Sequence, residues 1–179
     1  MNNIKFGIDM KEFFQPSKFQ FMGLLSILVC LLILLITYTD DRILIFASIM
    51  GILLIKHTLA DFYLQTEWQA KEKGYWGAEG GIIHSGIHGF LTFVYFLCLF
   101  TFIGFGEKSI ELSVLWLFGI TLFDTISHYI IDYTKARTTR ESEYAHRDAE
   151  YWRLIGVYQL SHNVVYLIIS YTITSQIIM

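Results

Sequence analysis

Histidine and aspartate residues recur at helical spacing in separate apolar stretches of this chain. In one stretch, His57, Asp61 and Gln65 follow one another at intervals of four residues. Side chains four positions apart lie on one face of an α-helix, so this stretch predicts a polar stripe along an otherwise apolar helix. Two later stretches repeat the spacing, one with His84 and His88 and the other with Asp124, His128 and Asp132.

Imidazole and carboxylate groups in this number predict a metal site. Ionisable side chains are costly inside a membrane, and they are retained where they pair, face a bundle interior or hold an ion. Imidazole with carboxylate suits zinc, iron, manganese or nickel. The lack of cysteine among these candidate ligands argues against a purely structural zinc site. We expect a divalent metal ion, with zinc first and manganese or iron as alternatives. The predicted metal ligands are His57, Asp61, His84, His88, His128, Asp132 and His162.

Within this set, one ion is expected to be shared by His57, His88 and His128, with Asp61 or Asp132 completing its ligands. The set is larger than one tetrahedral ion needs, so other members orient the ligands or belong to a second ion. A hydrogen-bonded network that relays protons without any metal is the alternative that this pattern leaves open.

Three further charged residues bear on the site. Asp124 is predicted to support the metal ligands or to act as a general base. Lys135 follows Asp132 by three residues, so it is expected to pair with that carboxylate, to meet a substrate phosphate, or only to extend toward the lipid headgroups. Lys56 points about 100° away from His57 on a helix, and no role is assigned to it.

The composition indicates an integral membrane protein. Of the 179 residues, 54% are hydrophobic and only 16% are charged, whereas a soluble domain has about 25% charged residues. The net charge of −3, without a basic stripe interleaved with aromatics, excludes a nucleic-acid-binding protein. Cys30 and Cys98 have no partner at metal or disulfide spacing, and both are expected to be small buried side chains.

The elements that must position the polar stripes are apolar helices. We predict an all-α fold, an integral membrane bundle of five transmembrane helices, preceded by an interfacial segment at residues 1–20. Each stretch is close to the ~20 residues that a helix needs to cross the hydrocarbon. The five predicted spans are 21–39, 43–65, 82–105, 109–133 and 151–178.

Alternation of these spans places every polar stripe near one membrane face. On a rise of 1.5 Å per residue, His57, His88 and His128 each lie roughly 9–12 Å below that face. Most Lys and Arg residues flank the same face, so the positive-inside rule predicts that it is cytoplasmic, with the amino terminus inside and the carboxyl terminus outside. The segment 135–150 is the most charged of the expected loops on this face.

The motif His57-x-x-x-Asp61-Phe-x-Leu-Gln65 resembles a family of small integral membrane proteins of prokaryotes and phages classed as a domain of unknown function (3307 type). The resemblance covers roughly residues 50–165 and implies a multi-pass protein of the prokaryotic inner membrane, but no activity. A weaker likeness of pattern is to small membrane proteins predicted to be metal-dependent hydrolases. The other matching positions are Lys71, His84, His88, Asp132, Lys135 and His162.

These observations predict a metal-dependent hydrolase that acts at the cytoplasmic leaflet on a phospholipid or another lipid-linked phosphate or acyl ester. The expected partners are membrane lipids, including a lipid substrate, and a homo-oligomer is left open. The alternative is not an enzyme but a channel, transporter or membrane-perturbing effector whose buried polar network is an ion or proton path.

Overall fold

The structure, a computed structural model, describes residues 16–39, 41–103 and 110–177. All regular secondary structure in these residues is helical, which confirms the all-α prediction. Most of the predicted interfacial segment 1–20 lies outside the described residues. The elements are α2 (Pro16–Thr37), α3 (Arg42–Thr58), the π-helical turn η1 (Leu59–Leu64), α4 (Glu67–Glu72), α5 (Glu79–Ile103), α6 (Ile110–Glu141) and α7 (Ala149–Ile177).

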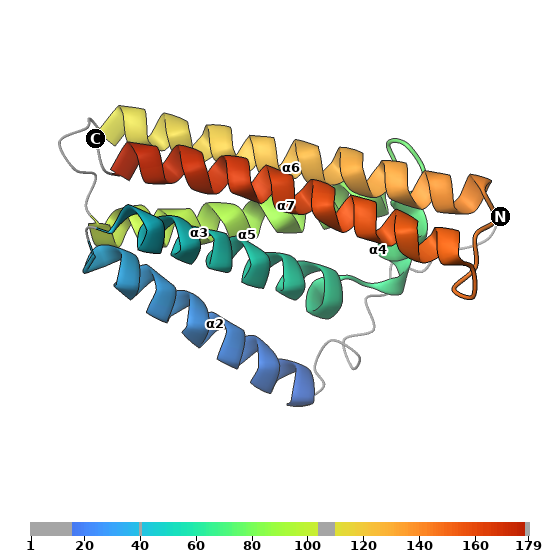
Figure 1. Cartoon of the computed structure of the whole chain (residues 1–179), viewed down its shortest axis with the longest axis horizontal. Coiled ribbons are helices and arrows are strands. Elements are labelled where there is room, and N and C mark those ends of the chain that lie inside the picture. Colours follow the sequence, from blue (N-terminus) through green and yellow to red (C-terminus); the bar gives the residue numbers. More distant parts are fainter. Residues whose placement is uncertain (1–15, 40, 104–109, 178–179) are drawn as a thin grey trace.

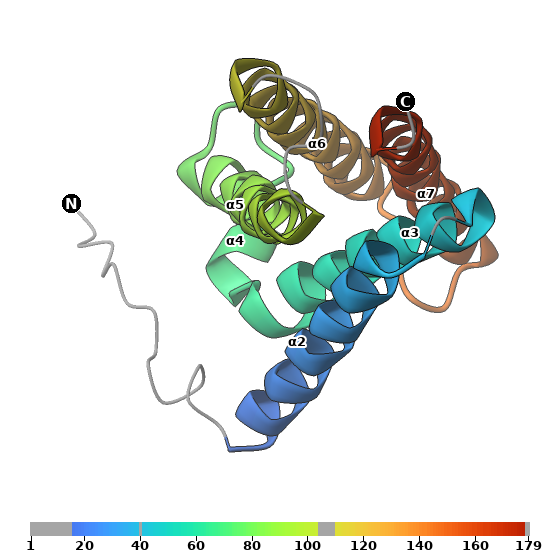
Figure 2. The ribbon, with the colours of Figure 1, turned by 90° about the vertical axis from the view of Figure 1, so that its left-hand side faces the viewer.

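Four long helices, α3, α5, α6 and α7, form the body of a bundle. Figure 1 shows α6 and α7 side by side along its length, and α3 packs against α5 and α7. Viewed along the bundle in Figure 2, α2 lies on the outside, where it contacts α3 and α5. Because successive helices alternate in direction, the end of α3, the start of α5, the end of α6 and the start of α7 meet at one end of the bundle (Figure 1).

Within the part of the chain that the structure describes, three helical segments are long and apolar enough to cross a membrane. They are Arg42–Leu64, Glu79–Thr101 and Val114–Glu141, whereas the apolar part of α2, Phe21–Thr37, is shorter. In α7 the apolar sequence is interrupted by Gln, Ser, His and Asn side chains between positions 159 and 163. The three apolar segments are consistent with membrane association. They do not confirm the prediction of five transmembrane helices.

The distribution of apolar side chains also suits a lipid environment. Part of the interior is an apolar core, in which Ile49, Phe96 and Leu99 are completely buried. Cys30 and Cys98 are free and lie on the exposed surface, contrary to the burial expected for them, since the outer faces of these helices are themselves apolar. So many large exposed apolar side chains are unusual on a soluble protein of this size. More than half of the side chain is exposed for Leu31, Phe90, Leu115, Phe118 and Leu122, among others.

Helix α6 is longer than the sequence predicts. It continues to Glu141, so the first part of the segment 135–150, expected to be a loop, is helical. Nε of Arg137 lies 2.8 Å from Oε1 of Glu141, a four-residue charge pair that favours helix on an exposed face. Predicting the end of this helix at the end of the apolar run was wrong because charged residues with good helix propensity extend it.

Helices α5 and α6 approach each other closely beside the polar residues. A Cβ atom at Gly89 would overlap Oγ1 of Thr125. Small residues at such crossings allow two backbones to come together in a membrane bundle. Since Gly89 follows His88 and Thr125 follows Asp124, this contact fixes how the polar faces of α5 and α6 meet.

Candidate metal centre

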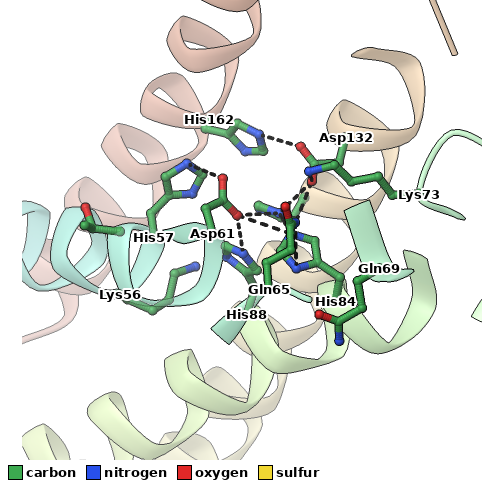
Figure 3. Close-up of polar contacts among 12 residues, drawn as sticks. Lys56, His57, Asp61, Gln65, Gln69, Lys73, His84, His88, Asp132 and His162 are labelled. Carbon is green, nitrogen blue, oxygen red and sulfur yellow. Dashed lines mark hydrogen bonds and ion pairs between the residues drawn. The ribbon is translucent and has the colours of Figure 1, made fainter. Parts of the chain in front are cut away.

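All seven predicted metal ligands come together in one buried cluster. His57 and Asp61 come from α3 and η1, and His84 and His88 from α5. Helix α6 contributes His128 and Asp132, and α7 contributes His162. Figure 3 shows the side chains of six of them, His57, Asp61, His84, His88, Asp132 and His162, pointing toward one another between the helices. The exposed fraction is 0% for His84 and His88 and remains small for the others, which are His57, Asp61, His128, Asp132 and His162.

Asp61 lies in the middle of this cluster. Its Oδ1 atom is 3.0 Å from Nε2 of His88 and 3.2 Å from Nε2 of His84. The same oxygen is 3.9 Å from Nε2 of His128. Its other oxygen, Oδ2, is 3.3 Å from Nε2 of His57. A single carboxylate therefore contacts histidines from both sides of the cluster (Figure 3).

Asp132 has a similar position on the opposite side. Its Oδ2 atom is 3.3 Å from Nε2 of His84 and 3.4 Å from Nε2 of His128. Its Oδ1 atom is 3.4 Å from Nε2 of His162. Nζ of Lys73 lies 2.9 Å from Oδ2, and this ion pair balances one of the two negative charges.

The nitrogen and oxygen atoms of the cluster are close enough to share a metal ion. One group consists of Asp61, His84, His88 and His128, and a second consists of His57, His128 and His162; within each, the ligand atoms lie within 4.8 Å of one another. His57 and His88 fall in different groups, although their rings are in contact, so one ion shared by His57, His88 and His128 stays a prediction. Helix depth does not determine how each helix is rotated about its axis.

The buried nitrogens fit this reading. Nε2 of His57 and Nδ1 of both His88 and His128 have no hydrogen-bond partner among the described residues. Buried polar atoms are normally satisfied, so the unpaired Nε2 of His57, which faces Oδ2 of Asp61, is available to an electropositive group such as a metal ion. The residues present thus fit a divalent ion, whose identity the side chains leave open.

The π-helical turn η1 explains how Asp61 enters the cluster. Turns of this kind are rare and often occur at functional sites. A π-helical turn has more residues per turn than an α-helix, so the predicted four-residue stripe does not continue through it. Gln65 lies just past the turn, with an extended backbone (φ −68°, ψ 130°). The Gln65 side chain nevertheless returns to the cluster, where its amide nitrogen is 3.0 Å from Nε2 of His84.

Tyr166 is a member of the cluster that the motifs do not identify. Its hydroxyl forms a 2.8 Å hydrogen bond with Nδ1 of His57, and only 1% of the residue is exposed. A partner on one imidazole nitrogen fixes the ring and directs the other nitrogen to its target, here toward Asp61. Tyr166 lies four residues after His162, and this helical spacing is the signal that identifies it.

Lys56 is part of a second buried polar group, next to the histidines. Its ammonium donates to Oδ2 of Asp124 at 2.7 Å, and the Thr92 hydroxyl donates to the same oxygen at 2.6 Å. The ammonium also lies 4.8 Å from the centre of the Tyr166 ring. Among the described residues, Lys56 and Thr92 are the hydrogen-bond partners of the Asp124 carboxylate. These contacts do not test the predicted role of Asp124 as a base. A lysine within an apolar span requires a carboxylate at similar depth, and this signal points to the pair.

Lys73, rather than the predicted Lys135, neutralises Asp132. It comes from the segment after α4, which is fastened to α6: the amide of Gly77 donates to the Tyr129 hydroxyl at 2.7 Å, with φ of +75° at this glycine. Among the described residues, the ammonium of Lys135 forms no hydrogen bond or ion pair with another side chain. Sequence spacing within a helix does not reveal a partner supplied by a loop.

A family model described as a protein of unknown function (DUF3307) matches residues 49–178, which include every residue of the cluster. No curated protein and no solved structure matches the chain.

Proposed function

We propose that this chain, which belongs to the DUF3307 family, is a metal-dependent membrane hydrolase that acts on a lipid or a lipid-linked ester. The observation that carries the proposal is the distance of 3.3 Å between Nε2 of His84 and Nε2 of His128, both buried. In a tetrahedral site with ligand bonds of about 2.0–2.1 Å, two nitrogens lie about 3.3–3.4 Å apart. Oδ1 of Asp61 lies 3.2 Å from Nε2 of His84 and 3.0 Å from Nε2 of His88. These two distances support the same geometry.

The side chains have separate roles in this proposal. Asp61, His84, His88 and His128 hold a divalent ion, which would lower the pKa of a bound water and polarise the scissile ester. Lys73, whose side chain is 12% exposed at the edge of the cluster, offers a cation to an anionic headgroup. We assign Asp124 to the framework, since its partners are Lys56 and Thr92.

The arrangement in the membrane is part of the proposal. We place five helices across a prokaryotic cell membrane, with the site and the amino terminus on the cytoplasmic side. What supports this is the alternation of the helices, which brings the four site-bearing helix ends to one end of the bundle (Figure 1). Basic residues that flank that end are Lys71, Lys73, Arg137, Arg140, Arg147 and Arg153.

An ion or proton path is the second candidate function. Polar contacts lead inward from His57 through Tyr166 to Lys56 and Asp124, and such chains of groups relay protons in membrane transporters. Beyond this pair, however, the interior consists mainly of apolar residues, among them Ile49, Ile52, Phe96, Leu99, Leu117 and Ile173. The cluster lies at one end of the bundle, where Asp61 and Lys73 each retain 12% side-chain exposure, and this position favours the hydrolase.

A hydrolysis assay on the purified protein separates these functions. We expect a phospholipid or a lipid phosphate in mixed micelles to be cleaved, chelation to stop the reaction and a divalent ion to restore it. H88Q should lower the rate at least 100-fold. H146Q is the matched control, because His146 is exposed and its ring packs on Tyr151, away from the cluster. Chelator-insensitive ion flux in proteoliposomes, without hydrolysis of any ester, would favour the path instead.

A further inference from the structure

The cluster contains more donors than one ion uses, and their atoms divide between two positions. We propose that it holds two metal ions bridged by the carboxylates of Asp61 and Asp132. This inference rests on the metal site proposed above and specifies its nuclearity.

The two oxygens of Asp61 face different histidines. Oδ1 contacts the pair from α5, His88 at 3.0 Å and His84 at 3.2 Å, whereas Oδ2 contacts His57 of α3 at 3.3 Å. With imidazoles at both oxygens, the group is placed as a bridge between two ions.

Asp132 divides its contacts in the same way. Oδ2 faces His84 at 3.3 Å and His128 at 3.4 Å, and Oδ1 faces His162 of α7 at 3.4 Å. Each carboxylate thus has one oxygen toward the α5 histidines and the other toward a histidine of α3 or α7. Two independent side chains on different helices show the same division.

The histidines on the α3 and α7 side form a second set of donors. The rings of His57 and His162 lie 4.8 Å apart between centroids. Nε2 of His57 is buried without a hydrogen-bond partner among the described residues, while its Nδ1 is held by Tyr166. The ligand atoms of His57, His128 and His162 lie within 4.8 Å of one another, and Oδ2 of Asp61 and Oδ1 of Asp132 contact His57 and His162 from either side. His128 belongs to both groups and lies between the two positions.

Manganese titration of the intact chain tests this inference. The protein is purified in detergent, stripped with a chelator and titrated with Mn²⁺, and bound manganese is counted per chain. Two ions are expected, with an electron paramagnetic resonance spectrum of an exchange-coupled pair. H162Q should bind one ion and lose the coupling, whereas H146Q should keep both. Because H162Q could disturb folding, H57Q removes a donor from the same position, and thermal unfolding is measured for each variant.

The outcomes separate this inference from the proposed function. One ion per chain in the unmodified protein overturns the two-ion centre and leaves the hydrolase standing. No bound ion in the folded protein overturns both. Two coupled ions that persist in folded H162Q and H57Q overturn the assignment of the second position to these histidines.

Discussion

Nζ of Lys56 lies 2.7 Å from Oδ2 of Asp124, and the two side chains are only 0% and 1% exposed. The pair joins α3 to α6 inside the bundle, and Thr92 of α5 donates to the same carboxylate oxygen. One carboxylate therefore ties three helices together. Lys56 also precedes His57 in the chain, so this junction sets the position of a cluster histidine.

Breaking the Lys56–Asp124 pair should destabilise the protein strongly. K56M leaves a buried carboxylate unpaired, and we expect it to lower the free energy of unfolding by about 3–5 kcal/mol. The double variant K56M/D124L strands no charge, so its cost should be clearly smaller than the sum of the two single costs. Reversible denaturation in detergent measures all three. Additive costs would show that the two groups do not interact.

A smaller loss is expected when the Thr92 hydroxyl is removed. T92V deletes a 2.6 Å hydrogen bond to a charged group, and such bonds contribute about 1.5–3 kcal/mol. T101V is the control on the same helix, because Thr101 is exposed and donates only to the carbonyl of Leu97. It should change stability by less than about 0.5 kcal/mol. Equal effects of the two substitutions would contradict a special role for Thr92.

Tyr166 should act on metal affinity at the second proposed position, that of His57 and His162, rather than on the fold. Y166F removes the hydroxyl that holds Nδ1 of His57 but keeps the ring, and loss of such a partner typically weakens metal binding by about 10–100-fold. Zn²⁺ titration of the purified variant provides the measurement. Y171F serves as the control, because Tyr171 is 71% exposed on the same helix. An unchanged affinity in Y166F would exclude this role.

Gly89 should tolerate no side chain. A methyl group there would overlap Oγ1 of Thr125, and we expect G89A to destabilise the protein by about 1–3 kcal/mol through overpacking. At Gly86, one turn earlier, a Cβ meets no atom within 4 Å. G86A should therefore be neutral or slightly stabilising, since alanine is the better helix former. Thermal unfolding of the two variants gives the comparison, and similar midpoints would contradict the close approach of α5 and α6.

Much of the cluster follows from sequence by simple geometry. Four-residue spacing placed His84 and His88 on one face, and alternation of apolar helices brought them to the same end of the bundle as Asp61 and His128. Both steps depend only on helix rise and direction. All-α architecture follows in the same way from long apolar runs.

The partners within the cluster depend on features that spacing does not contain. The rings of His57 and His88 touch edge to face, yet their ligand atoms fall in different groups. The π-helical turn removes Gln65 from the expected stripe. Lys73 reaches Asp132 from a loop, at a sequence separation of 59 residues. The pairing of Lys56 with Asp124 was within reach of the sequence, since a buried lysine requires a counter-ion.

X-ray absorption spectroscopy of the zinc-loaded protein tests most directly that the buried histidine–aspartate cluster binds a metal ion. We expect a shell of nitrogen and oxygen ligands at about 2.0–2.1 Å, outer-shell scattering from imidazole, and no sulfur near 2.3 Å. H88Q should change this spectrum, and H146Q should leave it intact. A folded protein that retains no zinc, or a zinc spectrum without imidazole scattering, would contradict the account.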